Sequence, residues 1–215
     1  MKIIVTAGPT REHLDPVRFL SNPSTGKMGF ALAEAAVKRG HDAILVAGPV
    51  SLKTPAGVKR VDVVSAREMF HAVKSEVVAS LAQGTQTVVV GAAAVADWRP
   101  AVCSARKLKK SEMGGVLKLV RNPDILKSLR VFRKKGLKMV GFAAETGDPV
   151  AEASRKCREK GLSFVVGNDV SEAGSGFGVD TDRVVLVYPD GCEKRFPLMS
   201  KRQVAKSVVK AMEAL

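Results

Sequence analysis

A stretch dense in hydrogen-bond donors, from Thr6 to Gly29, carries the side chains best suited to binding an anion. Its glycines, Gly8, Gly26 and Gly29, let backbone N–H groups approach a ligand with no Cβ in the way. The glycine spacing fits neither G-x-G-x-x-G nor G-x-x-x-x-G-K-[ST], so the stretch predicts a phosphate or anion binder of another design. The alternative is a long polar connection without a ligand. Its side-chain donors are hydroxyl, guanidinium, amide and ammonium groups: Thr10, Arg11, Arg18, Asn22 and Lys27.

Two further stretches, GAAAVADWRP at residues 91–100 and GFAAETGD at 141–148, pair small residues with an acid. Small residues after a buried strand let a ligand lie against the backbone. Asp97 and Glu145 would then emerge at the end of a strand. A carboxylate at the position of Asp97 can accept a hydrogen bond from a ribose or base, or hold a cation. A helix cap or a turn is the alternative role for Asp97.

Two basic segments could close over these stretches. In ARKLKKSEMGG, residues 105–115, Lys107, Lys109 and Lys110 alternate with Leu108, which is typical of a strand or flap with one solvent-facing side. An ordinary solvated face explains this segment equally well. In a predicted helix over residues 149–160, Arg155, Lys156 and Lys160 share one face.

The elements that must position these side chains alternate between strand and helix. Short apolar runs predict parallel strands joined by right-handed crossovers, and Ser21 or Ser24 could cap the first helix. The sequence therefore predicts an α/β fold, a Rossmann-like, mostly parallel sheet flanked by helices, ending in an antiparallel hairpin around the turn at 189–191. The strand ends at Thr6, Gly91 and Gly141 should converge on one edge of the sheet. No linker interrupts the chain, so residues 1–215 form one domain. The strands are expected at 2–6, 43–47, 58–64, 87–90, 116–120, 138–143, 163–166, 184–188 and 193–197, and the helices at 29–39, 66–80, 123–130, 149–160 and 200–215.

Composition limits the classes of partner. A net charge of +14 attracts polyanions, either nucleic acid or small molecules with several phosphates. Aromatic residues are only 5% of the chain, so the stacking platforms of a single-strand binder are scarce and small anions are favoured. The three cysteines and three histidines show no metal-ligand spacing, which fits a reducing cytoplasm. No signal peptide or membrane span is present, so we expect a soluble cytoplasmic protein without membrane contacts. No side-chain set resembles an activated nucleophile, so catalysis would depend on positioning and on neutralising charge, as in phosphoryl and nucleotidyl transfer.

In order along the chain, TAGPTRE, DPVRFLSNPSTGKMGFALAEAAVKRGH, AAVADWRP, KLKK, NPDIL, GFAAET, NDV and GFGVDTDRV closely resemble the phosphopantothenoylcysteine synthetases. The resemblance implies a ligase of coenzyme A biosynthesis that joins 4′-phosphopantothenate to L-cysteine. In bacterial members, CTP with Mg²⁺ activates the carboxylate as an acyl-cytidylate and releases pyrophosphate. The cysteine amine then displaces CMP. Eukaryotic relatives use ATP, and the bacterial form of AAVADWRP and GFAAET favours CTP here.

The resemblance also implies roles for individual residues. Asn22 corresponds to the asparagine that holds the acyl-cytidylate, and Lys107 to the essential lysine of a flap over the site. Family members are homodimers that share residues between subunits. No metal ligands are assigned. The implied nucleotide-binding positions are Gly8, Ala92, Ala93, Ala94, Asp97, Pro123, Asp124, Ile125, Leu126, Phe142, Lys156 and Lys160.

Most bacterial members carry a flavin-dependent decarboxylase domain in front of the synthetase. This sequence begins at the first synthetase strand, so a decarboxylase would be either a separate partner or a fused domain outside this sequence. Two other functions are alternatives. A nicotinamide-dependent oxidoreductase would require G-x-G-x-x-G after the first strand and an acid at the end of the second, and the sequence has neither. A basic nucleic-acid-binding module would bind DNA or RNA with a steep dependence on salt.

Overall fold

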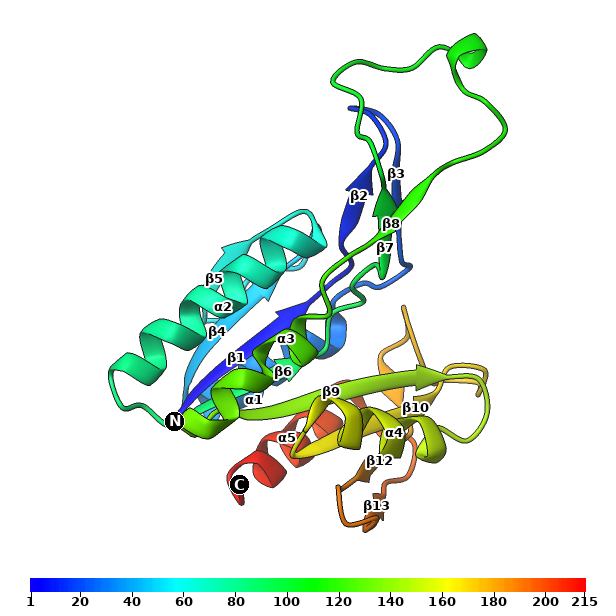
Figure 1. Cartoon of the computed structure of the whole chain (residues 1–215). Coiled ribbons are helices and arrows are strands. Elements are labelled where there is room, and N and C mark those ends of the chain that lie inside the picture. Colours follow the sequence, from blue (N-terminus) through cyan, green and yellow to red (C-terminus); the bar gives the residue numbers. More distant parts are fainter.

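A computed structural model describes residues 1–215, and its centre is an eight-stranded sheet in the order β13-β12-β10-β9-β6-β1-β4-β5 (Figure 1). All the pairs from β10 to β5 are parallel, while β12 and β13 form an antiparallel hairpin at one edge. The predicted mostly parallel sheet with a terminal hairpin is therefore confirmed. The strands are β1 (Lys2–Ala7), β4 (Asp42–Ala47), β5 (Lys59–Asp62), β6 (Thr87–Gly91), β9 (Lys138–Glu145), β10 (Phe164–Asp169), β12 (Val184–Val187) and β13 (Glu193–Arg195).

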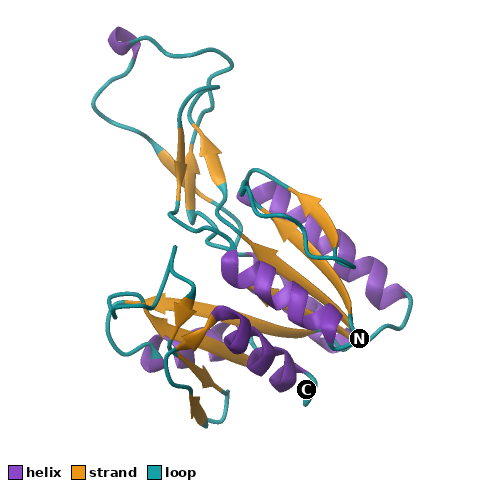
Figure 2. Ribbon diagram, turned by 180° about the vertical axis from the view of Figure 1, so that it is seen from behind, coloured by secondary structure: helices purple, strands orange, loops and turns teal.

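Helices cover both faces of this sheet (Figures 1 and 2). Successive side chains of a strand point to opposite faces, so Ile3 and Val5 pack with α1 and α5 while Ile4 packs with α2. Because both faces are buried, the central strands are continuously apolar. None of the helices is both long enough and apolar enough to cross a bilayer. The helices are α1 (Lys27–Lys38), α2 (Ala66–Ala82), α3 (Ile125–Leu129), α4 (Val150–Lys160) and α5 (Lys201–Met212), with short 3₁₀ turns at Lys110–Glu112 and Arg130–Lys135.

Two helices begin with a serine cap, while the first helix does not. The Ser65 hydroxyl accepts from the Glu68 N–H at 3.2 Å, and Ser200 begins α5 with a capping box. The prediction that Ser21 or Ser24 caps α1 is wrong. The N-cap is Gly26, with a φ of 81° and no side-chain cap, because the chain turns sharply there and only glycine adopts that conformation at no cost.

Two small antiparallel pairs form an arm that stands beyond the edge of the main sheet (Figure 1). The first is a hairpin of β2 (Arg11–His13) and β3 (Phe19–Ser21), and the second pairs β7 (Trp98–Pro100) with β8 (Leu119–Arg121). Between β7 and β8 the chain makes a long excursion, residues 101–118, which we call the arm loop. We predicted a strand or flap over 105–115 and a strand over 116–120, where the structure has β8 at Leu119–Arg121. Strands β2, β3 and β7 were not predicted. One more short pair joins β11 (Thr181–Asp182) to β14 (Met199–Ser200).

Candidate active site

The ends of β1, β6 and β9 lie side by side at one edge of the sheet, as predicted. The predicted end of the third strand is corrected, since β9 continues past Gly141 and Ala143 to Glu145. The extension is held by its pairing with β10, in which Glu145 lies opposite Asp169. Parallel strands place such ends at the crevice where α/β proteins bind their ligands.

A cavity of about 600 Å³ opens at this edge. Its volume lies within the range of small-molecule sites. It brings together segments far apart in sequence: the 91–97 stretch, the start of α3, Phe142 of β9 and the outer face of α4. Ten of the twelve positions that the resemblance assigns to a nucleotide line it, namely Ala93, Ala94, Asp97, Pro123, Asp124, Ile125, Leu126, Phe142, Lys156 and Lys160.

Small residues and backbone hydrogen bonds shape the wall of this cavity. The Ala93 N–H donates to Thr6 Oγ1 at 3.1 Å, and the Ala94 N–H donates to the Gly8 carbonyl at 2.9 Å. A Cβ on Gly91 would lie 2.8 Å from Leu126 Cδ1, so a larger residue there would displace Leu126 from the cavity. Gly8 itself does not line this cavity. It supports the wall through the bond from Ala94 to its carbonyl.

The cations of the cavity are paired with carboxylates. Lys156 Nζ lies 2.9 Å from Glu145 Oε1, and Lys160 Nζ lies 2.8 Å from Asp124 Oδ2. Arg155 donates to Glu152, which holds the pKa of that carboxyl below its usual value. The positive and negative charges lining the cavity are therefore balanced locally. A bound polyanion must displace these carboxylates or arrive with its own cations.

A smaller cavity of about 140 Å³ adjoins the first and shares Ala93, Ala94, Phe142 and Ala144 with it. Ala92, the eleventh assigned position, lines this one, together with the start of α1.

Sequence analysis missed two charged residues of the smaller cavity. Asp182 is buried and accepts from Asn168 Nδ2 at 3.1 Å, and its burial raises the pKa of the carboxyl. The Lys201 ammonium donates to the carbonyls of Gly176 and Val179 at 2.7 and 2.8 Å, and burial lowers its pKa. No local pattern distinguishes Lys201 from other helix-start residues, because its burial depends on the loop that it holds.

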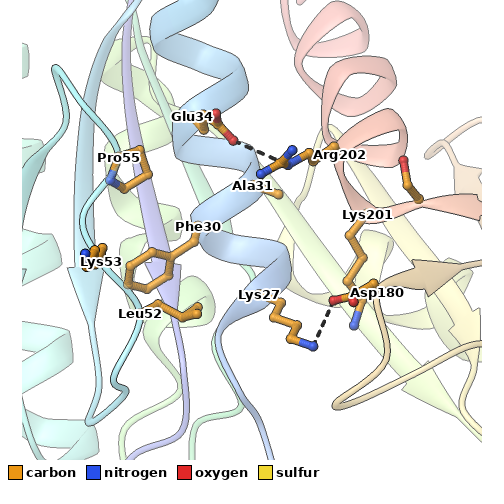
Figure 3. Close-up of a pocket in the computed structure, with 11 residues that line it drawn as sticks. Lys27, Phe30, Ala31, Glu34, Leu52, Lys53, Pro55, Asp180, Lys201 and Arg202 are labelled. Carbon is orange, nitrogen blue, oxygen red and sulfur yellow. Dashed lines mark ion pairs between the residues drawn. The ribbon is translucent and has the colours of Figure 1, made fainter.

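A third cavity, of about 520 Å³, lies between α1 and the start of α5 (Figure 3). The Lys27–Asp180 pair at 2.8 Å and the Glu34–Arg202 pair at 3.9 Å border it. Lys27 and Lys201 line both this cavity and the small one. None of the positions that the resemblance assigns to a nucleotide or to catalysis lies here.

Of the two residues with implied catalytic roles, Asn22 lies next to the large and small cavities and Lys107 does not. Asn22 lines neither cavity, but its Nδ2 donates to the Ala94 carbonyl of the shared wall at 3.0 Å. Lys107 is exposed on the arm loop. The expectation that residues 105–110 close over the strand ends is wrong within one chain, because the arm carries them away from the sheet (Figure 1). The segment 155–160 does line the large cavity.

The chain gathers no cluster of three histidine, cysteine, aspartate or glutamate side chains that could hold a metal ion. A Mg²⁺ ion that arrives bound to the phosphates of a ligand would not need such a cluster. Mg²⁺ commonly binds in that way, through substrate phosphates, waters and one or two carboxylates.

Comparison with known proteins identifies the family. Residues 1–215 match the model of the DNA/pantothenate metabolism flavoprotein C-terminal domain. The chain is 45% identical over 214 residues to the coenzyme A biosynthesis bifunctional protein CoaBC of Bacillus subtilis (strain 168), covering 99% of this chain and 51% of that protein. It therefore spans about half the length of the curated relatives it matches.

Solved structures agree with this match. The crystal structure of a CoaBC C-terminal domain superposes with a TM-score of 0.79 at 41% identity, covering 99% of this chain and 96% of that one. A mutant of Cab2 in complex with phosphopantothenate-cysteine shares the fold, with a TM-score of 0.79, 16% identity and coverage of 99% and 86%. The chain belongs to the DNA/pantothenate metabolism flavoprotein C-terminal domain family and corresponds to the C-terminal, synthetase half of the CoaBC proteins.

Proposed function

We propose that the chain is a CTP-dependent phosphopantothenate–cysteine ligase. In the first step, a carboxylate oxygen of 4′-phosphopantothenate attacks the α-phosphorus of CTP, forming an acyl-cytidylate and releasing pyrophosphate. In the second step, the cysteine amine attacks the acyl carbon, an amide forms, CMP leaves and the amine loses a proton. The observation that carries the proposal is the large cavity, where ten positions implied for the nucleotide meet in a chain of the synthetase family.

Charge explains how this cavity would accept a triphosphate. Lys156 and Lys160 are held by Glu145 and Asp124 in the free protein, within reach of the same space. Phosphate oxygens would replace the carboxylates as partners of these two ammonium groups. Because the cavity is otherwise neutral, Mg²⁺ bound with the nucleotide would supply the charge that offsets the remaining repulsion between the two anionic substrates.

The second step needs a group that acts on the acyl-cytidylate without adding charge. Asn22 lies beside the wall shared by the two cavities and uses one amide N–H on Ala94. Its other N–H remains available for the acyl or phosphate oxygen, where charge develops as the amine attacks. The small cavity next to Ala94 offers space for part of a second substrate.

The arm supports assembly as a homodimer. It carries exposed apolar side chains that its own chain leaves partly uncovered: Val17, Phe19, Leu20, Trp98, Val102, Met113, Val116, Leu117 and Leu119. Clustered exposed apolar residues of this kind mark interaction sites. A second copy bound through the arm would bring its Lys107 to the large cavity, which Lys107 does not reach within its own chain.

The whole protein would act in coenzyme A biosynthesis, the pathway named for its relatives. A flavin-dependent decarboxylase, fused or separate, would take the ligase product as its substrate. The cysteines Cys103, Cys157 and Cys192 are all free, which is consistent with a reducing cytoplasm.

The test is pyrophosphate release by the purified protein with 4′-phosphopantothenate, Mg²⁺ and each of the four nucleoside triphosphates, with and without L-cysteine. We expect release with CTP, poorer release with ATP, and amide product only when cysteine is present. No release with any nucleotide from a folded protein would overturn the proposed function. Release that is independent of phosphopantothenate would indicate a nucleotide hydrolase instead.

A further inference from the structure

Leu108 is the residue of the arm loop that makes the most hydrogen bonds with the β2–β3 hairpin. Its N–H donates to Asp15 Oδ2 at 3.2 Å, and its carbonyl accepts from Arg18 Nη2 at 2.9 Å. Both backbone polar groups of Leu108 are therefore held by the hairpin, across 93 residues of sequence in the case of Asp15. One further backbone bond, from the Ser104 N–H to the Leu14 carbonyl at 2.9 Å, enters the loop from the same side.

The two carboxylate oxygens of Asp15 accept hydrogen bonds from different groups. Oδ1 accepts the N–H groups of Val17 and Arg18, both at 2.9 Å, and closes the turn of the hairpin. Oδ2 accepts from the guanidinium of Arg18 and from Leu108, and so reaches outside the turn. The residue is 0% exposed, and the Arg18 guanidinium holds the pKa of the carboxyl far below its usual range, so Asp15 is ionised at neutral pH. The turn alone would need only one of these oxygens.

Lys107 immediately precedes the residue that Asp15 holds. The rest of the arm loop has few anchors. Its clearest side-chain ion pair, Arg106 with Glu112 at 2.6 Å, lies within the loop itself. Anchoring Leu108 therefore fixes the backbone from which Lys107 projects, which reduces the conformational entropy lost when its ammonium group engages a ligand.

We infer that Asp15 is a positioning residue, which acts through Leu108 to set the direction in which Lys107 leaves the arm. This inference rests on the proposed function, in which the ammonium group of Lys107 serves the nucleotide cavity of a second copy. Asp15 itself lines none of the three cavities described above.

The test uses Asp15→Asn in the full chain. The asparagine keeps one oxygen for the turn and places an NH₂ group where Oδ2 accepts. The turn therefore remains, while the bond from the Leu108 N–H and the ion pair that orients Arg18 towards the Leu108 carbonyl are lost. Site-specific trypsin cleavage after Lys107 and Lys109 should become about tenfold faster, the change expected when a charge-assisted hydrogen bond is removed. The matched control is Asp190→Asn, whose oxygen accepts from the Cys192 N–H at 3.0 Å in a distant hairpin. It should leave these cleavage rates unchanged.

Hydrogen exchange in the wild-type protein gives a second measurement that does not depend on how the variant folds. The Leu108 amide should exchange much more slowly than the amides of Gly114 and Gly115 in the same loop. Exchange of Leu108 at the rate of those glycines, or unchanged cleavage in Asp15→Asn, would overturn the inference.

Kinetic measurements distinguish a positioning role of Asp15 from a merely structural one. Asp15→Asn should lower kcat for pyrophosphate release several-fold and leave KM for the nucleotide unchanged, whereas general loosening would change both. In a Lys107→Gln background the Asp15 change should have little further effect. An equal, additive loss in both backgrounds would contradict the inference. A wild-type protein that releases no pyrophosphate would overturn the proposed function, which the cleavage and exchange measurements do not test.

Discussion

The side-chain amide of Asn22 donates to the backbone carbonyl of Ala94 at 3.0 Å, linking the end of the first hairpin to the wall between the two cavities. Ala94 is itself fixed from the other side, since its N–H donates to the Gly8 carbonyl. Asn22 is thus oriented by a hydrogen-bonded wall, while the second N–H of its amide has no partner in the chain. That arrangement suits a residue which must meet a transient oxyanion without moving.

Asn22→Ala should therefore leave CTP binding within about twofold of wild type and lower amide product by about 100-fold, the usual effect of losing one oxyanion donor. Nucleotide binding is measured by calorimetry, and product by mass spectrometry. Ser21→Ala is the matched control, because the hydroxyl of this neighbouring residue donates to the Thr10 carbonyl at 2.8 Å and Ser21 lines none of the described cavities. It should retain product formation. Near wild-type amide formation by Asn22→Ala would remove its proposed role.

Lys107→Gln should lower turnover by at least tenfold with little change in Tm, because the side chain is exposed and makes no ion pair. Complementation tests whether it acts across subunits. When Lys107→Gln and Asn22→Ala subunits are unfolded and reassembled together, mixed dimers should have one intact site, which restores about a quarter of wild-type activity. No restoration, from dimers shown to exchange subunits, would mean that a single subunit supplies both residues of each site.

Sequence patterns predicted the sheet more fully than the arm. Buried strands such as Lys2–Ala7 have continuous apolar runs, and Ser65 and Ser200 carry their capping signals locally. The strand Phe19–Ser21 is exposed at every position, so it has no burial pattern and depends on its pairing with residues 11–13. Local patterns are informative where burial imposes a period, and they fail where long-range pairing alone makes the strand.

The candidate site, too, could be predicted only in part from the sequence. Strand ends indicated where the cavity would be, because parallel topology fixes which loops meet. The pairing of Lys160 with Asp124 was not predictable, since it joins two elements that only the tertiary fold brings together. The burial of Asp182 and Lys201 was not predictable either, because the glycine-rich loop produces it.

Lys156→Gln should raise KM for CTP about tenfold or more, because an ammonium–phosphate contact contributes about 1.5–3 kcal/mol. Asp124→Asn should lower KM for CTP, since it frees Lys160 from its 2.8 Å partner and makes the cavity more positive. Steady-state kinetics at a fixed Mg²⁺ concentration measures KM for CTP in both variants. Lys134→Gln, on an exposed turn away from the cavity, is the control. An unchanged KM in Lys156→Gln would remove that residue from the nucleotide site.

Gly48→Ala should destabilise the fold by about 1–3 kcal/mol, as overpacking does, and lower Tm by about 5 °C in a chain of this size. A Cβ on Gly48 would lie 1.8 Å from the Pro9 carbonyl oxygen, a backbone atom that cannot rotate away. Gly114→Ala meets nothing within 4 Å and should change stability by no more than about 0.5 kcal/mol. Thermal unfolding of both variants measures the difference, and equal Tm values would contradict the close approach.

Glu213, just after α5, gives a prediction about acid stability. Hydrogen bonds from Arg39 and then His41 lower its pKa from 4.5 to about 2. A carboxyl whose pKa is depressed by folding stabilises the native state above its unfolded pKa, and that contribution is lost as the pH falls from 4.5 towards 2. The Tm difference between wild type and Glu213→Gln should therefore be largest above pH 5 and disappear near pH 2. The control is Asp42→Asn, which changes a more exposed carboxylate whose lysine partner lies 3.6 Å away and should show a smaller difference at every pH. A Glu213→Gln difference that persists undiminished at pH 2 would show that the contribution of Glu213 does not depend on its charge.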